Sequence, residues 1–324
     1  MSVYSKIASK GKLTLGLVFP LEAYRGSIAK MENQEQLAKR AEELGFKALW
    51  FRDVPFNDPN FGDAGQLYDP WIYMTHIMNQ TKQIALGSAS IILPLRHPVH
   101  TAKSINSLQI LSSERLILGV ASGDRPIEYP AFAQQLENKS ELFRDSFHYI
   151  KALQGDFPKY TSKFYGNTNG GIDLLPKYYK KTPMLVTGHS GQSLDWIAEH
   201  SDGWLYYPRD FKTLELVMQQ WRNSLSKIQI DWKPFMQSLY VDVTIDPKSA
   251  PTPIHLGFRS GTEYLNAHLK LLESYGVNHV ILNLKYGSRP AIELIEEIGE
   301  HVIPNFSYTH GRKKIKPVAD LIKR

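Results

Sequence analysis

The chain has 324 residues, of which 42% are hydrophobic and 22% charged, and it contains no cysteine. This length fits one large domain or two modest ones, and the composition excludes collagen-like, low-complexity and wholly disordered proteins. The lack of cysteine excludes disulfides, thiolate nucleophiles and thiolate metal sites, so any redox chemistry has to be carried by a bound cofactor.

The formal net charge of +6 arises mainly at the C-terminal end of the sequence. Residues 307–324 contain six Lys and Arg residues against the single Asp320, which leaves the rest of the chain nearly neutral. A short Lys-rich end is usually a solvated terminus. We therefore expect one domain over residues 1–306, a basic tail over residues 307–324, and no nucleic-acid partner.

The hydrophobic runs of the sequence are short. The longest, around residues 91–95, is far below the roughly 18 residues that a membrane span needs. Residues 1–12 are polar, with several lysines, and they lack the apolar core of an export signal. These features predict a cytoplasmic protein without a membrane partner.

Short apolar segments alternate with segments of helical period along the whole chain. The predicted strands are residues 13–19, 46–51, 84–93, 116–121, 184–187, 203–207, 238–245 and 280–284. The predicted helices that follow them are residues 33–44, 70–80, 98–111, 140–153, 192–200, 211–228, 261–275 and 291–301. Eight such units favour an α/β fold of the parallel βα (TIM) barrel type over a doubly wound sheet, which usually has fewer strands.

The active site of such a barrel lies on the loops that follow the strands. The two longest of these loops, residues 52–69 and 123–139, are the expected walls of a pocket. Residues 156–182 form an insertion before the fifth strand, with several aromatic residues and an Asn-Gly turn. An insertion of this length is a candidate lid.

The run 187–193 (TGHSGQS) directly follows the fifth predicted strand and opens a helix. Its small residues let a ligand approach the backbone, and the hydroxyls of Ser190 and Ser193 can donate to an anion. The run has neither a Walker lysine nor a full GxGxxG pattern. Phosphate binding and simple capping of the helix by one of these serines both fit the residues.

Four small residues, 87–90, interrupt the third predicted strand. They leave room at the barrel mouth in which a planar ring can rest. The same residues also fit the small half of an alternating core layer. The sequence alone leaves both interpretations open.

Two acid–base pairs follow predicted strands: Arg52-Asp53 after the second and Asp124-Arg125 after the fourth. Each pair alone fits a surface ion pair, but both on one barrel rim favour a polar pocket. His97 and His100 lie three apart at a helix start without an acidic residue nearby in the sequence. A metal site needs a third ligand and supporting contacts, so no metal is expected.

Several stretches, in this order, resemble the luciferase-like flavin monooxygenases. They are residues 41–50 (AEELGFKALW), 86–98 (LGSASIILPLRHP), 111–123 (LSSERLILGVASG) and 184–204, which contains GHSGQS and AEHSDGW. The similarity covers roughly residues 13–306. It implies a βα barrel that binds FMN, or a deazaflavin relative, at the C-terminal ends of the strands.

The resemblance implies two groups of cofactor-binding residues. The residues for the flavin phosphate are Gly188, His189, Ser190, Gly191 and Ser193. The residues behind the flavin ring are Ser88, Ala89 and Ser90. In the family, the peptide bond that corresponds to Ala89-Ser90 is often cis.

One departure from the family lies after the second strand. Many relatives carry an acid followed by a histidine there, and that histidine is a catalytic base in the bacterial luciferases. Here the run is Arg52-Asp53-Val54-Pro55, without the histidine. The departure argues against light emission with a long-chain aldehyde, and it leaves the catalytic role at this position to Asp53 or Arg52.

The resemblance implies a monooxygenase that uses reduced FMN and dioxygen on a small organic substrate. It also implies a separate flavin reductase as the source of reduced flavin, and a homodimer formed through helices of the first half. Two alternatives stay open. One is a flavin- or deazaflavin-dependent oxidoreductase that transfers hydride without oxygen, and the other is a flavin-binding protein without activity.

Overall fold

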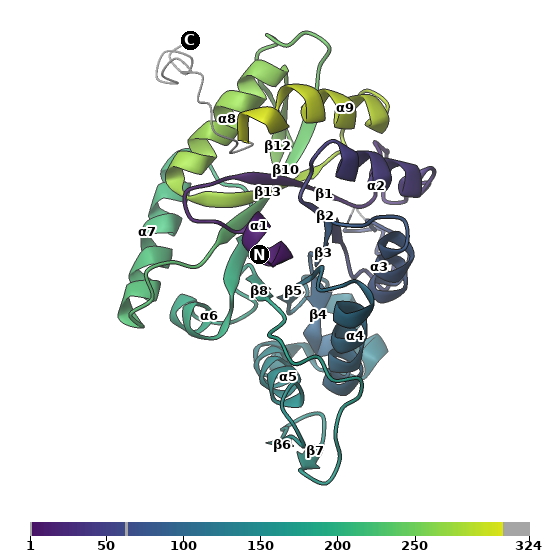
Figure 1. Cartoon of the computed structure of the whole chain (residues 1–324), viewed down its shortest axis with the longest axis vertical. Coiled ribbons are helices and arrows are strands. Elements are labelled where there is room, and N and C mark those ends of the chain that lie inside the picture. Colours follow the sequence, from purple (N-terminus) through teal and green to yellow (C-terminus); the bar gives the residue numbers. More distant parts are fainter. Residues whose placement is uncertain (1, 62–63, 307–324) are drawn as a thin grey trace.

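The computed structural model describes residues 2–61 and 64–306. Within them, eight parallel strands pair edge to edge, and the pairing of β9 with β10 closes the ring. In spatial order the strands are β10 (Phe235–Val243), β13 (Val277–Asn283), β1 (Thr14–Val18), β2 (Ala48–Phe51), β3 (Ala85–Ser88), β5 (Leu116–Ala121), β8 (Met184–Thr187) and β9 (Gly203–Tyr206). The predicted TIM barrel is confirmed (Figure 1).

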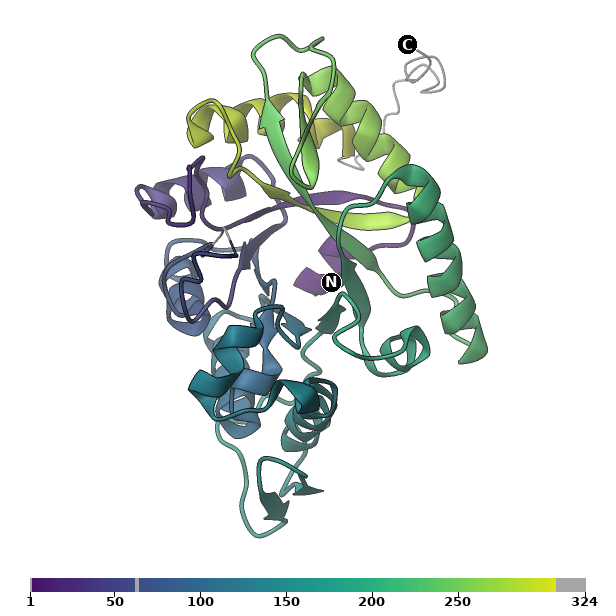
Figure 2. The ribbon, with the colours of Figure 1, turned by 180° about the vertical axis from the view of Figure 1, so that it is seen from behind.

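Helices surround the barrel, one after each strand unit (Figures 1 and 2). They are α2 (Gln34–Glu43), α3 (Pro70–Met78), α4 (Pro98–Leu111), α5 (Lys139–Leu153), α6 (Leu194–His200), α7 (Phe211–Lys227), α8 (Thr262–Tyr275) and α9 (Ala291–His301). Local sequence sets several starts: Asp69 and Asp210 accept hydrogen bonds from backbone N–H groups of the first turn of α3 and α7. None of the described helices is long and apolar enough to cross a membrane.

The third predicted strand, residues 84–93, is interrupted in the structure. β3 ends at Ser88, the peptide bond between Ala89 and Ser90 is cis, and β4 (Ile91–Ile92) resumes the pairing with β5. A 3-10 helix (Leu93–Leu95) follows. The prediction of one continuous strand is therefore wrong, and its small residues lie at the break.

Two hairpins were not predicted. β11 (Thr252–Ile254) and β12 (Gly257–Ser260) lie between β10 and α8, and β12 pairs in parallel with the end of β10. A Cβ atom at Gly257 would lie 1.8 Å from the carbonyl oxygen of Tyr240, so this approach requires glycine. The hairpin thereby extends beyond the C-terminal end of the barrel.

The insertion 156–182 contains the second hairpin, β6 (Lys159–Thr161) with β7 (Asn167–Asn169). Tyr160 donates from its hydroxyl to Oδ1 of Asp145 on α5 at 2.9 Å, and the hairpin lies at the far end of the molecule from β10 (Figure 1). No residue of the insertion contributes to the cavity described below. The interpretation of this segment as a lid is therefore not supported.

A short helix, α1 (Val3–Ile7), closes the N-terminal end of the barrel (Figure 1). Ile7 packs into the inner core cluster with Trp50 and Met236. Above it, the indole Nε1–H of Trp50 donates to Nε2 of His279 at 3.0 Å, and Nδ1 of His279 lies 2.7 Å from the hydroxyl of Thr14. That hydroxyl donates to the carbonyl oxygen of Ile7 at 3.0 Å, so the chain of hydrogen bonds links the helix to the barrel interior.

Because an indole N–H can only donate, Nε2 of His279 has to be the acceptor and its proton sits on Nδ1. The ring is fully buried, and this burial lowers its pKa from 6.5 to about 3. His279 is therefore neutral, and it lies beside the first residue of β1, Thr14.

Candidate functional site

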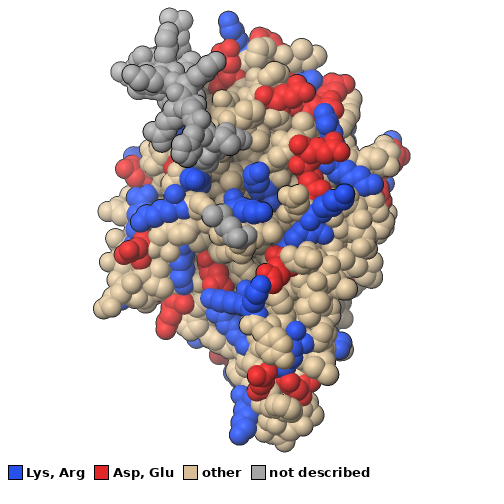
Figure 3. All heavy atoms as spheres, viewed as in Figure 1, with Lys and Arg blue, Asp and Glu red and all other residues tan. Residues whose placement is uncertain are grey.

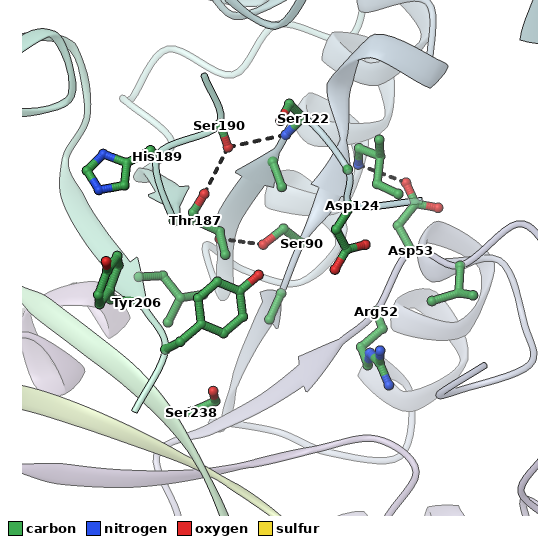
Figure 4. A pocket seen from close by; sticks show the side chains of 18 of the residues that line it. Arg52, Asp53, Ser90, Ser122, Asp124, Thr187, His189, Ser190, Tyr206 and Ser238 are labelled. Atoms are coloured by element: carbon green, nitrogen blue, oxygen red, sulfur yellow. Dashed lines mark hydrogen bonds between the residues drawn. The ribbon is translucent and has the colours of Figure 1, made fainter. Parts of the chain in front are cut away.

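A cavity of about 330 Å³ opens at the C-terminal ends of the barrel strands (Figure 4). Its walls come from the segments after β2, β3, β5, β8 and β9, and from residues of β10 and β13. The two predicted walls contribute residues 52–54, residues 123–125 and Lys139. The cavity thus lies where active sites of βα barrels are found.

The alternation of side chains along β2 decides which of its last residues enters the cavity. Ala48 and Trp50 belong to the inner cluster of the barrel, whereas Phe51 belongs to the outer core beneath the helices. Both Arg52 and Asp53 line the cavity, Arg52 as a continuation of the inner row and Asp53 as a continuation of the outer row. The predicted pair is therefore split between two sides of the strand.

Both carboxylate oxygens of Asp53 are held by its neighbours. Arg96 donates through Nε to Oδ2 at 2.8 Å and through Nη2 to Oδ1 at 2.7 Å, and the backbone N–H of Ile92 donates to Oδ2 at 3.0 Å. Arg96 also donates to Asp69, the cap of α3, at 2.8 Å. Asp53 is 5% exposed, and its partner is Arg96 instead of the adjacent Arg52. These contacts join the segment after β2 to the segment after β3.

Arg52 and Asp124 lie on the same side of the cavity (Figure 4). Tyr207 lines it as well, and burial together with the charge of Asp124 raises the pKa of its hydroxyl, against the opposing effect of Arg52. The charges of Arg52 and Asp124 therefore both act on the hydroxyl of Tyr207 on this side of the cavity. Asp124 is not the partner of Arg125, which lies 3.6 Å from the buried Glu128 and over the ring of Phe61.

The loop after β8 turns sharply at the predicted phosphate residues. Gly188, Ser190 and Gly191 have φ values of 56°, 48° and 73°, and they line the cavity together with His189. A Cβ atom at Gly191 would lie 1.8 Å from Oγ of Ser140, so only glycine fits there. At its start, the backbone N–H of Gly188 donates to the carbonyl oxygen of Leu205 at 2.8 Å, which joins the loop to β9.

The two predicted hydroxyls of this loop have structural roles. Ser190 donates from Oγ to the carbonyl oxygen of Thr187 at 2.8 Å and accepts from the backbone N–H of Ser122 at 3.2 Å (Figure 4). Ser193 caps α6 by accepting from the N–H of Trp196 at 3.2 Å, and it does not line the cavity. The capping interpretation is confirmed for Ser193, whereas Ser190 joins the ends of β5 and β8.

Lys139 is the last residue of the predicted wall 123–139, but no pattern in the sequence singled out its charge. It is the first residue of α5 and lines the cavity near Ser190 and Gly191, and no acidic partner for it is found in residues 2–61 and 64–306. The contact that brings it there is tertiary: Ser140 donates from Oγ to the carbonyl oxygen of Gly191 at 2.7 Å. No local sequence pattern marks such a contact.

The three residues of the predicted ring site face different ways. Ala89 and Ser90 line the cavity, and the hydroxyls of Ser90 and Thr187 share a short hydrogen bond (Figure 4). Ser88 is fully buried outside the cavity and donates from Oγ to the carbonyl oxygen of Gly119 at 2.8 Å. The cavity wall after β3 is therefore a small, flat surface made by residues 89 and 90.

The histidine pair considered for a metal lies outside the cavity. His97 caps α4, where its Nδ1 lies 3.3 Å from the backbone nitrogen of Val99, and its ring contacts Tyr165 edge-on. Among the residues that the structure describes, no group of three His, Asp or Glu side chains is arranged to hold a metal ion.

Two named relatives are similar in sequence. The alkanal monooxygenase alpha chain of Photorhabdus luminescens is 25% identical over 173 residues, which are 51% of this chain and 44% of that protein. The F420-dependent hydroxymycolic acid dehydrogenase of Mycobacterium tuberculosis is 25% identical over 187 residues, which are 56% of this chain and 50% of that protein. The chain thus matches about half the length of these curated relatives.

The fold is similar to that of solved enzymes at low identity. The crystal structure of monooxygenase RslO1 from Streptomyces bottropensis superposes with a TM-score of 0.75 at 15% identity, covering 91% of this chain and 100% of that one. The family described as luciferase-like monooxygenase matches residues 14–254. This match covers most of the barrel, and the chain therefore belongs to the luciferase-like monooxygenase family.

Proposed function

We propose that this protein is a flavin-dependent oxidoreductase, and specifically a monooxygenase that uses reduced FMN and dioxygen on a small organic substrate. One observation supports this proposal: a single cavity has a polar, positively charged end and a wall of small residues. Residues 188–191 and Lys139 form the polar end, and Ala89 and Ser90 form the wall. FMN has two matching parts, a phosphate and a planar ring.

The donor set at the polar end suits a phosphate. The turn over residues 189–191 offers backbone N–H groups, and Lys139 adds a positive charge without an acidic partner among the described residues. Ser193 caps α6 and does not line the cavity, so the proposal does not include it. We assign residues 188–191 and Lys139 to the phosphate and ribityl end of the cofactor.

The flat wall suits the ring of the cofactor. Ala89 and Ser90 would support one face of it, and Ser88 holds the wall from behind through Gly119. When bound, a reduced flavin supplies the electrons for the reaction. Arg52 faces the same lumen and would orient the substrate, whereas Asp53 would act as a positioning residue by fixing Ile92 and Arg96.

The second candidate is hydride transfer with a deazaflavin. The mycobacterial dehydrogenase named for F420 is as similar in sequence as the alkanal monooxygenase chain, at 25% identity each. The residues of the cavity accept either cofactor, because a deazaflavin also carries a phosphate and a planar ring. A monooxygenase and a hydride-transfer enzyme are therefore distinguished by whether the reaction uses oxygen.

The experiment supplies reduced FMN and isotope-labelled dioxygen to the protein with a panel of aldehydes, ketones and aromatic compounds. Monooxygenation puts the label into a product, and mass spectrometry detects it. The parallel reaction, without oxygen, supplies reduced F420 to the same panel. Product formation only in the anaerobic arm would replace the monooxygenase by the hydride-transfer enzyme.

We also propose a separate flavin reductase and a homodimer. Apolar side chains are exposed on the first-half helices α3 and α4, with Ile72 at 72% and Leu111 at 65% exposure. Such surfaces are often covered by a second copy of the chain. Light scattering tests the dimer, and a mass of about one chain would refute it.

A further inference from the structure

Two polar side chains on the side of the barrel opposite Ala89-Ser90 have unused hydrogen-bond donors. Ser238 of β10 and Asn283 at the end of β13 both line the cavity. They continue the inward rows of Met236 and Ile281, which belong to the inner core cluster. β10 stands four strands from β3 in either direction around the ring.

The amide of Asn283 has one possible orientation. Its Oδ1 accepts a hydrogen bond from the backbone N–H of Lys285 at 3.0 Å, so its Nδ2 is directed elsewhere. The residue is only 7% exposed, and no acceptor for Nδ2 occurs in the described chain. Because Asn283 lines the cavity, this donor is open to a molecule that binds there.

Ser238 lies close to this amide. In the pairing of β10 with β13, Tyr240 is opposite Asn283 and Ser238 is opposite Ile281, so the serine and the asparagine are diagonal neighbours on one face. The hydroxyl of Ser238 points into the cavity (Figure 4) and has no partner among the described residues. One small ligand can therefore reach both groups.

The surroundings define the chemistry of this ligand. Val18, Leu205, Leu256 and Ile281 give the same part of the cavity an apolar lining. The lining residues of β10 and β13 include no charged side chain. The fixed amide can only donate, so the ligand has to present an acceptor oxygen, and the apolar lining favours a neutral molecule.

We infer that Asn283 and Ser238 form a subsite for the carbonyl oxygen of a neutral, otherwise apolar organic substrate. This inference rests on the proposed function, because it takes the opposite wall at Ala89-Ser90 as the place of the flavin. It names the substrate class that the proposed function leaves open. The oxygen is bound by neutral donors, and the apolar body packs against the aliphatic lining.

The test compares two probes of nearly equal shape, cyclohexanone and methylenecyclohexane, with the FMN-loaded full-length protein. Ligand-observed NMR measures the affinity of each probe. We expect cyclohexanone to bind about fivefold more tightly, since one or two hydrogen bonds to neutral groups are at stake. Equal affinities, or no saturable binding of cyclohexanone, would overturn the inference.

The variants separate the donor from the shape of the site. Asn283→Asp keeps the bond to Lys285 and the size of the side chain but removes the donor, so the preference for cyclohexanone should disappear. Ser238→Ala should reduce the preference about two- to threefold. The matched control, Gln237→Leu, removes a buried amide that does not line the cavity, and it should change nothing.

Three further outcomes of these experiments also test the proposed subsite. If the Asn283 variant fails to fold by circular dichroism, Ser238→Ala carries the comparison. If either variant loses FMN affinity and keeps the probe preference, these groups face the cofactor and the inference is wrong. If FMN does not bind the wild type, the proposed function fails, whereas the same probe comparison on the unloaded protein still decides the subsite.

Discussion

At the scale of single residues, Asp53 combines a position at the barrel rim with contacts typical of a structural group. Its carboxylate accepts three hydrogen bonds from Arg96 and Ile92 while almost fully buried. Removal of the Asp53 carboxylate leaves the charge of Arg96 partly uncompensated, although Arg96 keeps its hydrogen bond to Asp69. We therefore predict that Asp53→Ala lowers the free energy of unfolding by about 2 to 3 kcal/mol.

Urea denaturation measures this loss, and the matched control is Asp58→Ala in the same loop. Among the described residues, the side chain of Asp58 accepts a bond only from the exposed backbone N–H of Asn60, so its replacement should cost well under 1 kcal/mol. An Asp53 variant with unchanged stability and lost turnover would instead make Asp53 a catalytic residue.

Among the described residues that line the cavity, Lys139 is the cation beside the loop 188–191, where we place the phosphate. We predict that Lys139→Met weakens FMN binding roughly tenfold or more, because a charge-assisted bond to phosphate is worth about 1.5 to 3 kcal/mol. Riboflavin, which lacks the phosphate, should bind the variant as it binds the wild type. Fluorescence titration measures both affinities.

The control for Lys139 is Lys212→Met, which removes a lysine from the first turn of α7, outside the cavity. A similar loss of FMN affinity in both variants would indicate a general charge effect. An unchanged FMN affinity in the Lys139 variant would remove this residue from the site.

Only part of the candidate site could be predicted from the sequence. Residues 187–191 and 89–90, which line the cavity, were singled out because each belongs to a local pattern in one segment. The charge of Lys139 and the amide of Asn283 were not singled out, because only closure of the barrel brings them to the cavity. The partner of Asp53 was also missed, because Arg96 lies 43 positions away in the sequence.

At the scale of elements, α1 and the barrel are joined through the neutral ring of His279. Burial lowers the pKa of this ring from 6.5 to about 3, and burial lowers the pKa of His268 to about 4. The unfolded chain thus binds protons below about pH 6.5 that the folded chain does not bind. The stabilising contribution is complete above pH 6.5 and decreases as the pH falls toward these lowered values.

We predict that His279→Gln reduces this pH dependence, while stability at neutral pH falls because Trp50 and Thr14 lose their partner. Denaturant melts between pH 7 and about pH 4 measure the slope. Part of the pH dependence should remain in the variant, because the buried His268 is still present. His301→Gln, at an exposed position, should leave the slope as it is in the wild type. An unchanged slope in the His279 variant would refute the neutral buried ring.

The elements themselves were largely predictable. Each main helix of the barrel begins and ends within two residues of its expected range, because apolar period and capping residues are local signals. The break after Ser88 was not seen, since residues 84–93 are all compatible with a strand. The hairpin β11–β12 was missed because it is made by pairing with β10 at Gly257.

At the scale of the whole molecule, the charge of the described body is mixed. On the face around α1, basic and acidic side chains lie interspersed (Figure 3). The predicted basic tail, residues 307–324, lies outside the described residues. The described fold ends with a 3-10 helix (Ile303–Phe306), whose Phe306 is buried and lies under the ammonium of Lys270 at 4.0 Å.

We predict that a chain ending at residue 306 keeps the stability and flavin affinity of the full chain. A chain ending at residue 301 should lose roughly 3 to 5 kcal/mol of folding free energy, because it lacks the buried side chains of Val302, Ile303 and Phe306. Thermal and urea melts compare the three chains. Loss of stability on removal of residues 307–324 alone would show that the tail packs against the barrel.

The central claim, that the cavity binds a flavin through its phosphate and ring, is tested most directly by equilibrium titration of the purified protein with FMN and with riboflavin. We predict saturable binding of FMN that is at least about tenfold tighter than that of riboflavin, because only FMN engages Lys139 and the loop 188–191. Equal affinity for the two compounds would contradict the phosphate site. Absence of binding for FMN and also for the deazaflavin F420 would contradict the account as a whole.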